Sequence, residues 1–186
     1  MPGHDCVLET GESLSVSLPP AYIFAGGKSS RFGRDKARAW IGGSRQLPRL
    51  VAMLLEQHYL VHVIADDAGR YQDLHIDCMV DTVPNSGPAG ALLTAAKRRH
   101  DDYGAGWLLC LGCDQLLWRS NWQEQILDFI RKSETEARNV QAAVFCREGD
   151  SGDSLQPLPG LYHSDIAAKT PDLHSHNRAE VSLRRW

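Results

Sequence analysis

The sequence predicts an α/β fold, a three-layer α/β/α sandwich in which a mostly parallel sheet lies between helices. Short apolar runs alternate along the chain with longer segments of helical spacing, which is typical of strands joined by crossover helices. One apolar run, Trp107–Leu111, is continuous, as expected of a central strand covered on both faces. The 186 residues, 42% of them hydrophobic, are enough for one domain with a substantial core.

The expected elements follow one another in a regular order. Residues 1–18 are polar and aperiodic, which predicts a flexible leader before a single domain at residues 19–186. The expected strands are Tyr22–Ala25, Leu60–Ala65, Ile76–Asp81, Trp107–Leu111 and Val140–Cys146. The expected helices are Leu47–Tyr59, Pro88–His100 and Asn121–Lys132. A further extended segment is expected at Gln156–Tyr162, where two prolines favour an edge strand or a bulge.

Composition limits the classes of function. The net charge of −3 argues against a nucleic-acid partner bound through overall basicity, so any anion site must be local. The sequence contains neither a signal-like nor a membrane-spanning apolar run, and we expect a cytoplasmic protein without a membrane partner. Five cysteines, with a lone C-x-x-C at Cys110 and Cys113, indicate reduced thiols in the core rather than a zinc site. On a strand, these two side chains would point to opposite faces.

The segment from Phe24 to Lys36 is the most informative part of the chain. Its adjacent glycines, Gly26 and Gly27, permit positive φ and a close backbone approach to a ligand, and successive N–H groups in such a turn bind anions. Four cations fall within eight residues: Arg31, Arg34, Lys36 and Arg38. The pattern is neither a P-loop, whose first glycine would fall at Tyr22, nor the dinucleotide pattern G-x-G-x-x-G. We predict a polyphosphate site here; a solvated basic loop is the alternative.

Three of the expected strands end in conspicuous groups. The first runs into Gly26 and Gly27, the third ends in Asp81, and the central one is followed by Asp114. Ligands of open parallel sheets bind outside the carboxyl ends of the strands. We therefore expect these three strand ends to meet in space.

The glycine-rich segment resembles the loop signature A-G-G-x-S-x-R-x-G-x-D-K of GT-A-type nucleotidyltransferases, and most closely that of the molybdenum cofactor guanylyltransferases, the MobA family. The matching residues are Ala25, Gly26, Gly27, Ser29, Arg31, Gly33, Asp35 and Lys36. Three further blocks resemble the family in the same order: Val80-Asp81 with Gly87–Gly90, then Leu108–Asp114, then Gln156–Tyr162. The resemblance covers roughly residues 20–165.

The resemblance implies a Rossmann-like GT-A fold and the transfer of GMP from GTP to the terminal phosphate of molybdopterin, with release of pyrophosphate. The nucleotide-binding residues that it implies are Ala25, Gly26, Gly27, Ser29, Lys36, Asp81 and Asp114. Arg31 and Lys36 would be catalytic, because they would stabilise charge on the α-phosphate and the departing pyrophosphate. Asp114 would also hold Mg²⁺, a hard ion suited to carboxylate and phosphate oxygens. Asp81 would lie near the base and ribose.

Several positions depart from the family's pattern. Gln115-Leu116-Leu117 follows Asp114 where the family has a small or apolar residue and then proline. Ile64 stands where guanine-specific members carry a polar group, and Phe32 replaces the usual methionine. The family's last block, an asparagine-containing strand-to-helix segment, has no counterpart before Trp186, so we expect a domain that lacks it.

These departures leave two alternative functions open. One is a nucleotide-binding paralogue without turnover that acts through a partner protein. The other is a nucleotidyltransferase with a different nucleotide or acceptor. Single residues also have alternative roles, since Asp81 and Asp114 could cap turns, and Asp35 could orient Lys36 or cap a local turn. Assembly with a protein partner or as a homo-oligomer is left open.

Overall fold

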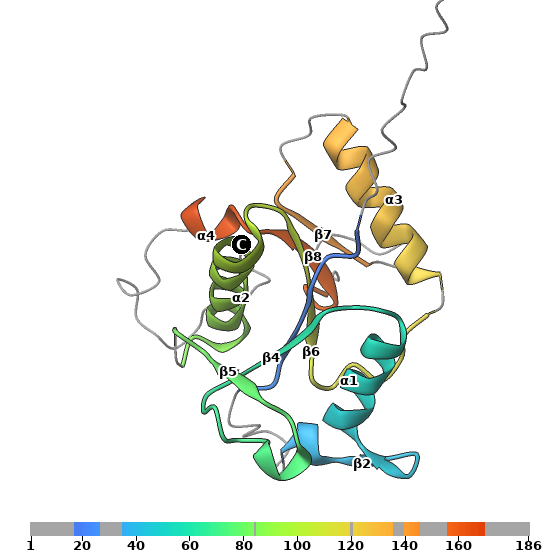
Figure 1. Cartoon of the computed structure of the whole chain (residues 1–186), viewed down its shortest axis with the longest axis vertical. Coiled ribbons are helices and arrows are strands. Elements are labelled where there is room, and N and C mark those ends of the chain that lie inside the picture. Colours follow the sequence, from blue (N-terminus) through green and yellow to red (C-terminus); the bar gives the residue numbers. More distant parts are fainter. Residues whose placement is uncertain are drawn as a thin grey trace, which may run out of the picture.

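A six-stranded sheet runs through the middle of the molecule. The structure, a computed structural model, describes residues 17–26, 35–83, 85–119, 121–135, 140–145 and 156–169. The strands of the sheet are β1 (Ala21–Phe24), β4 (Val61–Ala65), β5 (Cys78–Val80), β6 (Trp107–Gly112), β7 (Ala142–Val144) and β8 (Gly160–His163). They lie side by side in the order β5-β4-β1-β6-β8-β7 (Figure 1).

The remaining elements connect these strands. The α-helices are α1 (Gln46–Glu56), α2 (Gly87–Tyr103), α3 (Trp122–Thr135) and α4 (Ile166–Lys169). Two short 3₁₀ helices are η1 (Lys36–Arg38) and η2 (Gln72–Leu74). A small hairpin of β2 (Trp40–Ile41) and β3 (Ser44–Arg45) turns at Gly42 and Gly43, whose φ angles are 59° and 88°. Successive positive φ angles suit a tight two-residue hairpin turn, which explains the glycine pair.

Strand directions confirm the prediction of a mostly parallel sheet. β5, β4, β1 and β6 are parallel to one another, whereas β8 is antiparallel to both β6 and β7. The expectation that the proline-containing segment forms an edge strand or a bulge is wrong, because β8 lies between two strands. Pro157 and Pro159 precede the first ladder residue, Gly160, so neither ring removes a hydrogen bond from the sheet.

Helices cover both faces of the sheet, which confirms the three-layer sandwich (Figure 1). α1 and α3 pack on one face through side chains that include Leu47, Leu54 and Ile126. α2 packs on the other face, with Ala89 and Leu92 among its buried residues, and α4 adjoins the same cluster. The layers explain why apolar residues follow one another in the central strands without alternation.

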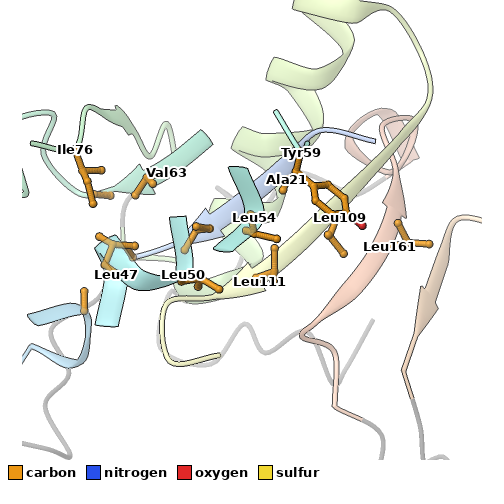
Figure 2. Close-up of a cluster of buried hydrophobic side chains, with 14 of the residues drawn as sticks. Ala21, Leu47, Leu50, Leu54, Tyr59, Val63, Ile76, Leu109, Leu111 and Leu161 are labelled. Carbon is orange, nitrogen blue, oxygen red and sulfur yellow. The ribbon is translucent and has the colours of Figure 1, made fainter. Parts of the chain in front are cut away.

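Strand β6 contributes alternate side chains to the two cores. Leu109 and Leu111 point toward α1 and α3, and Figure 2 shows them among the α1 leucines. Leu108 and Cys110 point toward α2. Cys113, just past the strand, packs against the α1 side, so the two cysteines of the C-x-x-C lie on opposite faces as predicted. Both are free thiols in the core, and β6 is a central strand.

Two further expectations concern the chain outside the sheet. Residues 1–16, most of the expected leader, lie outside the described residues, and Leu18 packs against the core. Among the described helices, none is long and apolar enough to cross a membrane.

Candidate functional site

Lys36 and Asp114 form an ion pair at the carboxyl ends of β1 and β6. The Lys36 Nζ donates to Asp114 Oδ2 at 2.9 Å, although the two residues are 78 positions apart in the sequence. Lys36 begins η1, and Asp114 follows β6 directly. Phe24 at the end of β1 is paired with Gly112 of β6, and the Cys113 N–H donates to the Phe24 carbonyl. The exposed fractions of the side chains are 34% for Lys36 and 57% for Asp114, so both charges face solvent.

The strand end before Asp114 is shaped by a glycine. A Cβ at Gly112 would lie 2.7 Å from the Asp114 Oδ1, so a larger residue would displace the carboxylate that folds back over this position. The Gln115 N–H then donates to the Gly112 carbonyl and closes a tight turn. After this strand end the Asp114 carboxylate faces Lys36.

A buried glutamine holds the chain that follows this turn. Gln46, the first residue of α1, is 1% exposed, and its Nε2 donates to the Gln115 carbonyl at 2.8 Å. Arg49 of the same helix donates to the Leu116 carbonyl. The Gln115-Leu116-Leu117 segment, which departs from the resembled pattern, is therefore fixed to α1 through its backbone.

Asp35, the residue before Lys36, is held by several hydrogen bonds. Its Oδ1 accepts from the Ala37 N–H at 3.0 Å and caps η1, whose first residue is Lys36. Arg70 donates to the Asp35 Oδ2 at 3.3 Å, and the hydroxyl of Tyr71 lies 3.1 Å from the same oxygen. Of the two roles that the sequence left open for Asp35, the structure shows the cap of a local turn.

The cluster around Tyr71 was not predicted from the sequence. Tyr71 is fully buried, and its hydroxyl lies 2.9 Å from the Ala25 carbonyl oxygen. Arg38 and Arg70 both place their guanidinium groups over its ring, 5.3 and 5.4 Å from the centroid. A signal was present, because the polar run from Asp66 to Arg70 follows the carboxyl end of a strand, where sites gather.

Arg38 has a structural role rather than the phosphate-binding role suggested by the cation cluster. It donates to both oxygens of Asp73 and, at 2.7 Å, to the Arg70 carbonyl. The hydrogen bond with Arg38 lowers the pKa of Asp73 and raises that of Arg38. Arg38 thereby ties η1 to η2 and to the chain before Tyr71.

Asp81 follows β5, an edge strand that is separated from β1 by β4. Its Oδ1 accepts from the Val83 N–H and from the Thr94 hydroxyl, both at 2.9 Å. The carboxylate therefore closes a local turn and joins it to α2. Ile64, the position that bears on base choice in the resembled pattern, is completely buried against α2, where its side chain cannot contact a nucleotide base.

Of the remaining predicted residues, Ala25 is buried, and its N–H donates to the Ile64 carbonyl at 2.8 Å. Gly26 is exposed, and its φ lies outside the left-handed region, so positive φ is not what requires glycine there. Gly27, Ser29 and Arg31 lie outside the described residues.

Cys113 lies close to the charged groups of the site. Burial raises the pKa of its thiol to about 11, and the charges of Asp114 and Asp35 add to the rise. The thiol is therefore protonated at neutral pH and is a poor nucleophile. At this edge of the sheet the structure therefore brings together a lysine ammonium and an aspartate carboxylate, those of Lys36 and Asp114.

Comparison with known proteins gives a consistent result. Residues 21–186 match the family model described as MobA-like NTP transferase domain. A probable molybdenum cofactor guanylyltransferase of Synechococcus elongatus is 29% identical over 154 residues, which cover 79% of this chain and 73% of the relative. The molybdenum cofactor guanylyltransferase of Rhizobium meliloti is 33% identical over 90 residues. That alignment covers 47% of this chain and 41% of the relative, less than half of its length.

Solved structures share the fold. Molybdopterin-guanine dinucleotide biosynthesis protein A from Archaeoglobus fulgidus superposes with a TM-score of 0.57 at 15% sequence identity. The superposition covers 81% of this chain and 70% of that one. A putative protein from Aquifex aeolicus gives a TM-score of 0.53 at 18% identity, over 82% and 73% of the two chains.

Proposed function

Since this chain belongs to the MobA-like NTP transferase domain family, we propose that it transfers the guanylyl group of GTP to the terminal phosphate of a molybdopterin-type acceptor. Pyrophosphate is the second product. Relatives named molybdenum cofactor guanylyltransferase support the choice of GTP and of the acceptor. The observation that carries the proposal is the Lys36–Asp114 pair at the carboxyl edge of the parallel strands.

Lys36 and Asp114 have different roles because their charges are opposite. Lys36 binds phosphate oxygens of the nucleotide and stabilises the charge that develops on the departing pyrophosphate. Asp114 would hold the metal ion that accompanies the nucleotide, through the carboxylate that faces Lys36 in this structure. Without nucleotide, the Lys36 ammonium is paired with the Asp114 carboxylate.

Asp114 fits Mg²⁺ in both its chemistry and its surroundings. Its carboxylate is exposed and already faces a cation, and Mg²⁺ accepts one or two carboxylates together with phosphate oxygens. Within the described residues, no group of three or more His, Cys, Asp or Glu side chains could hold a metal alone. This agrees with a metal that arrives with the triphosphate. When bound, Mg²⁺ would neutralise phosphate charge.

Two measurements test the proposal. Pyrophosphate release is followed with GTP, Mg²⁺ and molybdopterin, beside a titration of GTP–Mg²⁺ binding. Release that requires all three components is the expected result. Saturable binding without release would instead identify a nucleotide-binding paralogue that acts through a partner. A thermal-shift series with GTP, CTP, ATP and UTP tests the base, since a true ligand raises the melting temperature by mass action. A larger shift with another nucleotide would contradict the choice of guanine.

A further inference from the structure

The hydroxyl of Tyr71 lies between two points of the chain that are ten residues apart. It is 2.9 Å from the Ala25 carbonyl oxygen and 3.1 Å from the Asp35 Oδ2. Ala25 precedes the glycine-rich segment and Asp35 stands near its end. Both oxygens are acceptors and the hydroxyl has one proton, so the two share it as a three-centre hydrogen bond. Through this shared bond a single hydroxyl links the chain on either side of residues 27–34.

The ring that carries this hydroxyl is held firmly. Tyr71 is fully buried, and the guanidinium groups of Arg38 and Arg70 lie over its ring. Arg38 is in turn bound to Asp73, and Arg70 to Asp66. Burial also raises the pKa of Tyr71, and the charge of Asp35 adds to the rise, so the hydroxyl keeps its proton and remains a donor.

Asp35 in turn fixes the backbone of the turn that begins at Lys36. Its carboxylate caps η1 through the Ala37 N–H, and its backbone carbonyl accepts from the Arg38 N–H at 3.1 Å. Lys36 is therefore the first residue of a turn whose preceding carboxylate is fixed by Tyr71. From that position its Nζ reaches Asp114.

We propose that Tyr71 is a positioning residue of the nucleotide site, whose hydroxyl joins Ala25 to Asp35 and so places Lys36 opposite Asp114. The expected effect on nucleotide binding rests on the proposed function. The link between Ala25 and Asp35 through Tyr71 does not. Tyr71 touches no reacting atom and acts through Asp35.

The chain supplies a matched control in Tyr59. It is 2% exposed and belongs to the same core cluster as Tyr71, yet its hydroxyl has no hydrogen-bond partner among the described residues. Tyr71→Phe and Tyr59→Phe remove the same atom from buried positions of one core cluster. Only the first removes the link between Ala25 and Asp35. Asp35→Asn weakens the same link from the other side and replaces Tyr71→Phe if that variant fails to fold.

Amide hydrogen exchange of the nucleotide-free protein tests the positioning itself. In Tyr71→Phe we expect exchange at Ala37 and Arg38 to be about tenfold faster than in wild type, as for loss of one hydrogen bond to a charged group. Tyr59→Phe should match wild type at these amides. Equal exchange in the two variants would overturn the proposal.

Titration with GTP–Mg²⁺ tests the consequence for the site. Tyr71→Phe should raise the Kd about tenfold and Tyr59→Phe should leave it unchanged. Faster exchange with an unchanged Kd would overturn the role in nucleotide binding. If wild type binds no nucleoside triphosphate while Tyr71→Phe still speeds exchange, the proposed function fails and the positioning of Lys36 stands.

Discussion

Lys36 and Asp114 are joined by an ion pair of 2.9 Å across two neighbouring strand ends, although β4, β5 and α2 separate them along the chain. The pairing of β6 with β1 fixes the strand end that carries Asp114, and Gly112 leaves room for the carboxylate. Opposite charges thus meet at the carboxyl edge of the parallel strands, the edge where open sheets of this kind bind their ligands, and the proposed nucleotide site rests on this pair.

Removing either charge should abolish transfer and spare the fold. Lys36→Ala and Asp114→Ala should each reduce pyrophosphate release at least about 100-fold, the effect of losing one charge-stabilising group. Because both side chains are partly exposed, the free energy of unfolding should fall by less than about 1 kcal/mol. Lys97→Ala is the matched control, since Lys97 forms a similar exposed pair with Asp101 on α2. Full activity in both site variants would refute the assignment.

Gly90 should tolerate no side chain. A Cβ there would lie 2.9 Å from the Ser86 Cβ and would also clash with the Val83 carbonyl oxygen. Gly90→Ala should therefore lower the free energy of unfolding by about 1–3 kcal/mol in a urea titration. Gly26→Ala serves as the control for stability, because a Cβ at exposed Gly26 meets its nearest atom at 3.6 Å. Equal stability of the two variants would show that the α2 start relaxes more easily than its geometry indicates.

The central strand should be sensitive to cavities. Leu109 is completely buried on the face of β6 that α1 and α3 cover, so Leu109→Ala should destabilise the protein by about 2–5 kcal/mol. Leu117 is 75% exposed, and Leu117→Ala should change the free energy of unfolding by no more than about 0.5 kcal/mol. Calorimetric or denaturant unfolding of both variants measures the contrast, and a small loss at Leu109 would argue against its central position.

His62 should make stability depend on pH. Its ring stacks on Tyr22 with centroids 4.9 Å apart, and burial lowers its pKa below the ordinary value of 6.5. The unfolded state then binds protons more readily than the folded one. The contribution of His62 is therefore complete above pH 6.5 and is lost as the pH falls toward the folded-state pKa. His62→Phe should show a smaller loss of stability between about pH 7 and pH 5. Parallel pH profiles for variant and wild type would contradict this.

Much of the fold could be predicted because its signals are local and periodic. The continuous apolar run of β6 predicted a central strand, and both cores confirm it. The place of β8 could not be predicted, because Pro157 and Pro159 counted against an interior strand and only the register shows that they lie outside the ladder. The hairpin at Gly42 and Gly43 had a glycine signal without enough strand on either side to be recognised.

The candidate site could be predicted in part for the same reason. Asp114 follows a recognisable strand, so the rule for parallel sheets was enough to expect it at the edge where the glycine-rich segment begins. Lys36 was expected opposite it because of the basic residues and the resemblance of that segment. Tyr71 and Gln46 act through single long-range hydrogen bonds to backbone or carboxylate oxygens. Such contacts produce no periodic pattern in the sequence. Their partners are determined only by the packing of the whole domain.

The central place of β1 has a consequence for synthesis. During translation the first strand of the sheet emerges early, but one of its two hydrogen-bonded neighbours, β6, is made last among the four parallel strands. A sheet of β1, β4 and β5 formed before Trp107 and its successors leave the ribosome would carry β1 as an unpaired edge, and such edges are templates for association with other chains. The addition of β6 would remove that edge and would bring the strand end that carries Asp114 into the sheet at the same step.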